Sequence, residues 1–219
     1  MENLIQLIHN KTAFIDKALH GKFTSKELET LFTLATLFIA IFGFTIGLRH
    51  SWMQAIATAV KLPLLFILTG IICFLTLFIL QAFIGVQLNY KQLGSFLIVC
   101  IAISGTILLS FTPIVVFFLI SGTPYQVYKI INVLVLAFSG FSGFYIFKKH
   151  LGLKLIALND ASVLVRGKLI INSWILLYGC IGANLGFILS PVFGDKNVPF
   201  IWFTSSNENF FSHLIHILF

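Results

Sequence analysis

Long apolar stretches dominate the sequence, and the charged residues fall in the short segments between them. A helix that crosses a bilayer needs about 20 consecutive apolar residues, and a spanning backbone must satisfy its hydrogen bonds within itself. Stretches of this length are therefore predicted to be transmembrane helices. The predicted spans are 31–48, 63–84, 96–120, 128–147 and 169–189. We predict an all-α, polytopic membrane protein with a five-helix transmembrane domain at 23–190.

The composition excludes a water-soluble fold and argues against nucleic acid as a partner. Hydrophobic residues make up 58% of the 219 residues and charged residues only 10%, whereas soluble domains carry about 25% charged residues. The net charge of +7 comes from scattered basic residues that form no stripe. Cys73, Cys100 and Cys180 lie in apolar stretches without a CxxC pair, so neither a disulfide nor a thiolate metal site is expected. The predicted environment is the lipid bilayer, with no cofactor and no metal.

The apolar run at 53–84 is longer than one crossing requires, and Lys61-Leu62-Pro63 interrupts its first third. Proline is tolerated in the first turn of a helix. We therefore expect a short interfacial or tilted segment at 53–62 and a spanning helix at 63–84, with the Lys61 ammonium reaching out to the headgroups. Pro113 lies inside the third span, where its ring is expected to kink the helix.

The distribution of basic residues predicts the orientation, because Lys and Arg are enriched in cytoplasmic segments. With five crossings, ten of the 14 basic residues fall in the N-terminal segment and in the segments that follow the second and fourth spans. The other four, Arg49, Lys61, Lys129 and Lys196, fall on the opposite side. This asymmetry predicts a cytoplasmic N-terminus and an extracytoplasmic C-terminus.

Both ends of the chain carry the pattern of an amphipathic surface helix. In residues 1–22 the apolar positions recur at helical spacing, which fits a helix on the membrane surface or one packed on the protein's own loops. In the tail at 191–219, a capping box formed by Ser205 and Glu208 precedes an apolar helical face. Thr24 and Glu27 form the same type of box before the first span, so a helix is predicted to start there.

Ionisable residues are scarce inside the predicted spans. All seven acidic residues and all six histidines lie outside them. Proton-coupled carriers and cation pathways usually place such a group at membrane depth, so ion-driven transport is not expected. The strongly polar residues counted within the spans are Asn172 and Asn184, with Gln81 near an end.

Small residues at helical spacing predict close contacts between the spanning helices, because they let two backbones approach. They are Gly43 and Gly47 in the first span, Ser139, Gly140 and Gly143 in the fourth, and Gly179, Gly182, Ala183 and Gly186 in the fifth. An asparagine can hydrogen-bond across such a contact. We therefore favour an interhelical contact for Asn172 and Asn184, and the alternative is a polar path for a solute.

Two patterns that could carry chemistry are weak. Gly140-Phe141-Ser142-Gly143 matches the GxSG arrangement of rhomboid-type intramembrane serine proteases. A serine nucleophile needs a base within hydrogen-bond reach, and no predicted span contains a histidine. His213 and His216 share a helical face without a clear third ligand, which fits the polar face of a surface helix better than a metal site. We predict that the protein is not an enzyme.

The run Lys61-Leu62-Pro63-Leu64-Leu65-Phe66, the Phe111-Thr112-Pro113 kink and the five predicted spans resemble uncharacterised five-span bacterial membrane proteins that are similar in layout to the Yip1 group. The resemblance covers about residues 30–190. The acidic-Tyr-Gly-Pro signature of eukaryotic Yip1 proteins is missing, so no site residue is carried over. The resemblance implies a multi-pass protein of the bacterial inner membrane that acts through protein partners. Our hypothesis is a non-catalytic accessory or scaffold subunit of a membrane assembly, and the alternative is a permease or channel for a neutral or lipidic solute.

Overall fold

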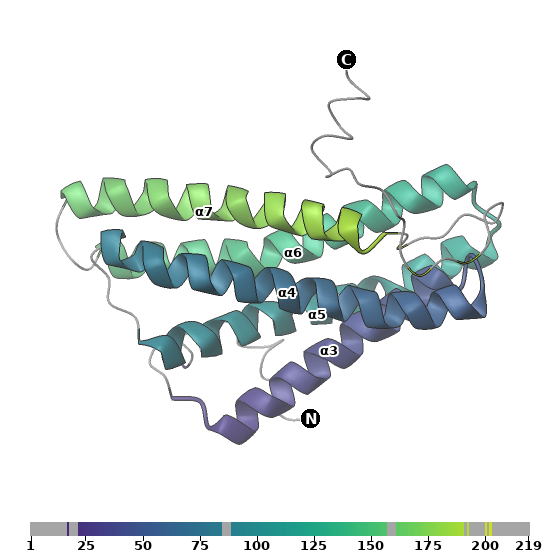
Figure 1. Cartoon of the computed structure of the whole chain (residues 1–219), viewed down its shortest axis with the longest axis horizontal. Coiled ribbons are helices and arrows are strands. Elements are labelled where there is room, and N and C mark those ends of the chain that lie inside the picture. The colour runs from purple at the N-terminus through teal and green to yellow at the C-terminus, as the bar shows by residue number, and fades with distance from the viewer. Residues whose placement is uncertain are drawn as a thin grey trace, which may run out of the picture.

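The computed structural model describes residue 17, residues 22–84, 89–156 and 161–190, and the single residues 192, 200 and 202. This part of the chain folds into five long helices without strands (Figure 1). They are α3 (Ser25–Gly47), α4 (Trp52–Ile84), α5 (Tyr90–Ile120), α6 (Tyr125–Ile156) and α7 (Ala161–Ile188). Each helix is long and apolar enough to cross a membrane. The predicted five-span, multi-pass membrane fold is confirmed.

Capping boxes fix the starts of two helices. At α3, the Thr24 backbone N–H donates to Glu27 Oε2 at 2.9 Å, as the sequence predicts. At α5, the Asn89 backbone N–H donates to Gln92 Oε1 at 3.0 Å, so this helix begins about two turns before the predicted start at 96. A box satisfies N–H groups that a helix start otherwise leaves without a partner. Pro113 lies inside α5, which continues to Ile120.

The predicted interruption of the second span is wrong, because α4 is one continuous helix of 33 residues with Pro63 inside it. Proline removes one backbone hydrogen bond, but packing on both sides of it compensates for that loss in a spanning helix. The segment at 53–62 is therefore the first third of α4. Lys61 does not extend to the headgroups as predicted; its side chain is only 3% exposed and lies against the protein.

The helices run up and down in a bundle (Figure 1). Helix α3 packs on α4 and α5, α5 also packs on α6, and α7 packs on α4 and α6. The α3–α4 turn at 48–51, the α5–α6 turn at 121–124 and the end of α7 lie at one end of the bundle. We call this the turn end. The predicted surface helices at 1–22 and 191–219 fall outside the described residues, apart from single positions.

Candidate functional site: buried polar groups at the turn end

Three polar side chains of α4 form a buried stripe near the turn end. Gln54, Thr58 and Lys61 are almost completely buried, and their spacing of four and three residues places them on one helical face. Lys61 lies nine residues after the start of α4 at Trp52, which corresponds to about 14 Å along the helix axis. An ionisable side chain is therefore buried within a candidate spanning helix, although all acids and histidines lie outside the predicted spans.

The α4 stripe binds backbone carbonyl groups of the C-terminal tail. Thr58 Oγ1 donates to the Val192 carbonyl at 2.8 Å, and Gln54 Nε2 lies 3.5 Å from the same oxygen. Lys61 Nζ donates to the carbonyl of Trp202. Because the acceptors are main-chain atoms, these contacts hold Val192 and Trp202 without depending on the side chains of these two residues.

A second polar region, the α3–α6 junction, consists of the buried residues Thr45, Tyr128 and Asn132 and the half-buried residues Arg49 and Thr123. The Tyr128 hydroxyl donates to the Thr45 carbonyl at 3.4 Å. The guanidinium carbon of Arg49 lies 5.5 Å from the centroid of the Tyr128 ring, and Arg49 Nη2 donates to the Thr123 carbonyl. The junction thus ties the end of α3 to the start of α6 through hydrogen bonds and a cation–π contact.

Asn132 is the residue of this junction that inspection of the sequence missed. It lies inside the fourth predicted span, whereas the strongly polar residues named from the sequence, Asn172, Asn184 and Gln81, lie in the second and fifth. Its side chain is 0% exposed, and Asn132 Nδ2 donates to the Tyr128 carbonyl at 2.8 Å. Asn132 Oδ1 and Arg49 Nε are buried without a hydrogen-bond partner among the described residues. The sequence signal for Asn132 is a single amide in an otherwise apolar helix. Placing a polar side chain in a spanning helix costs free energy, so such residues usually have a structural or functional role.

The predicted small residues of the first span lie where α3 approaches α4 most closely. A Cβ atom added to Gly43 would lie 2.6 Å from the Thr58 carbonyl oxygen, and one added to Gly47 would lie 2.5 Å from Ala55 Cα. Both neighbours are backbone atoms, so no side chain can move away to make room. Glycine is therefore required at these two positions for the observed distance between the helices.

Ser139 and Gly143 lie in the contact between α6 and α5. Ser104 Oγ donates to the Ser139 carbonyl at 2.9 Å. A Cβ atom on Gly143 would lie 2.8 Å from Ser104 Oγ and 2.9 Å from the Cys100 carbonyl oxygen. Gly140 has more room, because its nearest neighbour would be the Tyr178 hydroxyl at 3.9 Å. This pair of helices is joined by small residues and by hydrogen bonds across the contact.

The small residues of α7 are less closely packed. A Cβ atom on Gly186 would lie 3.4 Å from a Leu65 side chain, and one on Gly182 would lie 3.8 Å from Thr69. These are ordinary contacts with side chains of α4. Ala183 is half-buried, and Gly179 is exposed with nothing within 4 Å of an added Cβ. One face of α7 therefore packs on α4 through side chains, and another face is open.

The structure does not bring Asn172 and Asn184 together. Asn172 is exposed and Asn184 is half-buried. They are twelve residues apart on α7, which separates them by about 18 Å along the axis. The two amides therefore do not form a single polar site.

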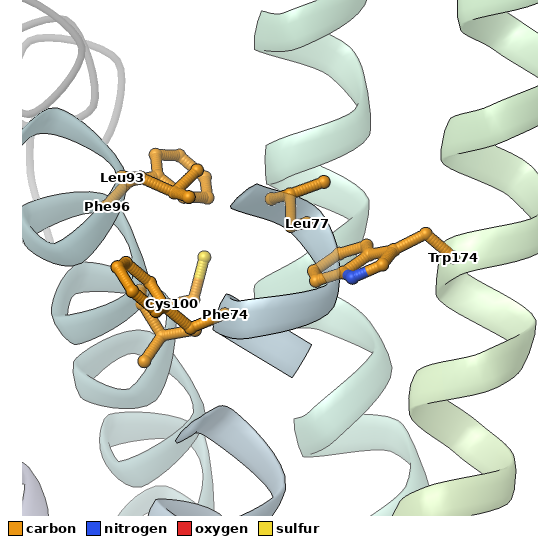
Figure 2. Close-up of a pocket in the computed structure, with 7 residues that line it drawn as sticks. Phe74, Leu77, Leu93, Phe96, Cys100 and Trp174 are labelled. Carbon is orange, nitrogen blue, oxygen red and sulfur yellow. The ribbon is translucent and has the colours of Figure 1, made fainter. Parts of the chain in front are cut away.

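A small apolar hollow lies between α4, α5 and α7 toward the end opposite the turn end (Figure 2). Its lining consists of Phe74, Leu77, Leu93, Phe96, Leu97, Cys100 and Trp174. Figure 2 shows the Trp174 indole extending from α7 toward Leu77 of α4. The Trp174 Nε1–H donates to the Cys73 carbonyl at 3.0 Å, which satisfies the one polar atom of the indole. The hollow has no group suited to acid–base chemistry.

No cluster of three histidine, cysteine or carboxylate side chains that could hold a metal ion occurs within the described ranges. Ser142 of the GxSG pattern donates its hydroxyl to the Ser139 carbonyl at 2.8 Å, within its own helix. Comparison of the chain with protein-family models, with curated proteins and with solved structures gives no match.

Proposed function

We propose that this protein is a non-catalytic accessory or scaffold subunit of a membrane assembly and that it binds its partner through the outer face of α7. The supporting observation is how little of α7 the rest of the chain covers. Only 11% of its most apolar segment is buried, compared with 44% for α3. A spanning helix that packs so little within its own chain has a free surface for a neighbour.

The chemistry of the open α7 face also favours a protein neighbour over lipid. Asn172, Ser173 and Gly179 are all exposed on this helix, together with Leu176. By contrast, the exposed side chains between residues 130 and 141 of α6 are all apolar, with Ile130, Leu134, Phe138 and Phe141 among them. An amide that faces hydrocarbon has no hydrogen-bond partner, whereas small and amide-bearing residues are typical of contacts between spanning helices.

The positions of the polar residues argue for a subunit over the alternative, a permease for a neutral or lipidic solute. A polar path would require Asn172 and Asn184 to face one continuous passage. They point about 120° apart around α7, since twelve residues make three and a third turns, and the hollow in Figure 2 has an apolar lining. The tight α3–α4 and α5–α6 contacts further favour a rigid support over a moving gate.

The orientation and location belong to the same proposal. We place the turn end outside a bacterial inner membrane and the N-terminus in the cytoplasm, on the strength of the ten basic residues predicted on the inner side. In this arrangement the partner lies beside α7 in the plane of the bilayer.

Photo-crosslinking within the membrane tests this proposal. A benzophenone amino acid at Leu176, which is 72% exposed on α7, is compared with the same group at Leu134, which is 62% exposed on α6. We expect a discrete protein adduct from position 176 only, and less of it when Asn172→Leu removes the exposed amide. A tagged chain that purifies alone in mild detergent and forms no protein adduct from position 176 would contradict the proposal.

A further inference from the structure

The α3–α6 junction contains two buried polar atoms of opposite kind that have no hydrogen-bond partner among the described residues. Arg49 Nε is a donor and Asn132 Oδ1 is an acceptor. Both side chains are otherwise held in place, since Arg49 Nη2 donates to the Thr123 carbonyl and Asn132 Nδ2 donates to the Tyr128 carbonyl. Neither atom can therefore reach a new partner without giving up an existing bond.

Leaving such groups without partners is costly, and nearly all buried polar atoms in proteins are hydrogen-bonded to the chain, to water or to a ligand. The cost is greater in a membrane protein, because bulk water is remote from a side chain that is 0% exposed. A hydrocarbon side chain of the same size as asparagine would avoid the cost completely. The presence of Asn132 thus indicates a partner that comes from outside the described chain.

The two orphaned atoms define the chemistry of this partner. Both atoms lie on side chains that contact Tyr128. A partner that serves both must accept a hydrogen bond from the guanidinium of Arg49 and donate one to the amide oxygen of Asn132. A fully ionised phosphate or carboxylate can only accept, and an ammonium group can only donate. A hydroxyl group does both.

We propose that the α3–α6 junction is a binding site for a hydroxyl-bearing ligand that bonds to Arg49 Nε and Asn132 Oδ1. Two sources supply this chemistry, ordered water and the glycerol headgroup of a membrane lipid. Asn132 lies seven residues after the start of α6 at Tyr125, or about 10 Å along the axis. Arg49 is half-buried in the α3–α4 turn, so a ligand that enters from the turn end meets Arg49 first and Asn132 below it.

The substitution Asn132→Leu tests the proposal, because the direction of the change in Tm depends on whether a ligand is bound. Leucine has the same number of non-hydrogen side-chain atoms and the same branching as asparagine, and the Tyr128 carbonyl that loses its side-chain donor still lies within the hydrogen-bonded helix α6. If Oδ1 is truly without a partner, its removal stabilises the protein or leaves it unchanged. If a ligand is bound, its hydroxyl loses the acceptor and Tm falls by about 2 to 12 °C for a chain of this length. Asn172→Leu is the matched control, because it makes the same change at an exposed position of α7.

The measurement is thermal unfolding of the full chain in nanodiscs made of phosphatidylglycerol or of phosphatidylcholine, whose headgroup has no hydroxyl. A lower Tm for Asn132→Leu in both lipids identifies water. A higher Tm of the unsubstituted protein in phosphatidylglycerol, lost in Asn132→Leu, identifies the lipid hydroxyl. Arg49→Lys, which keeps the charge and removes Nε, is expected to follow Asn132→Leu. An Asn132→Leu protein with unchanged or raised Tm in both lipids would overturn the proposal.

Discussion

The close approach of α3 to α4 predicts that Gly43→Ala destabilises the protein. A Cβ atom at this position would lie 2.6 Å from the Thr58 carbonyl oxygen and 3.2 Å from Leu62 Cβ. An ordinary contact requires about 3.4 Å, so the two helices must separate locally by about 0.8 Å. Separation would also disturb the neighbouring Gly47 contact, where Ala55 Cα is the nearest atom.

The expected size of the effect follows from two opposing contributions. Inserting one carbon into a tightly packed contact costs about 1 to 3 kcal/mol, and the upper half of this range applies because the nearest neighbour is backbone. Replacing glycine by alanine inside a helix returns up to about 1 kcal/mol. The net loss is about 1 to 2 kcal/mol, which lowers Tm by roughly 2 to 8 °C for a chain of this length.

Two native cysteines provide the assay. Cys73 and Cys100 are both buried, so a thiol-reactive dye labels them only as the bundle opens on heating. Cys180 is half-buried and is replaced by serine in every protein compared. The matched control is Gly179→Ala, because nothing lies within 4 Å of an added Cβ there. It keeps the helix-propensity gain without the clash, and its Tm is expected to stay the same or to rise by about 2 to 4 °C.

The pair of glycine substitutions separates the packing explanation from a general intolerance of substitution in spanning helices. Equal loss of stability in Gly43→Ala and Gly179→Ala would refute it, as would a Gly43→Ala protein as stable as the unsubstituted chain. Gly143→Ala is expected to lower the stability by an intermediate amount. One of the two close neighbours of its added Cβ atom is the Ser104 side-chain hydroxyl, which can move, and the other is a backbone oxygen.

The remaining predictions concern the hollow and the orientation. Trp174→Phe is expected to lower the free energy of unfolding by about 1 to 3 kcal/mol in the same dye assay, because it removes the bond to the Cys73 carbonyl and leaves a cavity. Trp174→Leu should lower it further, and a Trp174→Phe protein of unchanged stability would contradict the role of the indole. In a cysteine-free chain, Ser121→Cys is expected to react with a membrane-impermeant maleimide added to intact cells, and Ser25→Cys only after the membrane is permeabilised. The reverse labelling pattern would show that the orientation is opposite to the predicted one.

The five helices follow from the sequence because apolar length alone decides whether a segment can cross a bilayer. The course of α4 does not follow in the same way. From the local sequence alone, Lys61 is expected to extend to the headgroups and Pro63 to lie in the first turn of a helix. In the structure the lysine is held by the carbonyl of Trp202, a residue distant in sequence. Contacts of this kind leave no signal in the local pattern.

The small residues show the same limit. Gly43-xxx-Gly47 and Gly182-xxx-Gly186 carry identical patterns, yet only in the first pair would an added Cβ atom lie within 3 Å of backbone atoms of another helix. The pattern indicates that two helices can approach closely, and whether they do depends on how the facing helix packs. Asn132 is missed for a related reason, since its burial depends on the helices packed around α6 and not on its neighbours in sequence.

The burial of Lys61 also bears on the predicted orientation. The enrichment of Lys and Arg in cytoplasmic segments is counted over the loops and the ends of the spans. A charge in these segments either stays in the cytoplasm or crosses the membrane when the protein is inserted. Lys61 was counted on the outer side on the assumption that it belongs to an interfacial segment. Since it is buried nine residues inside α4 and binds the carbonyl of Trp202, it leaves that count, and Arg49, Lys129 and Lys196 remain on the side predicted to be extracytoplasmic. The charge asymmetry is therefore larger than the sequence indicates, in the direction of a cytoplasmic N-terminus.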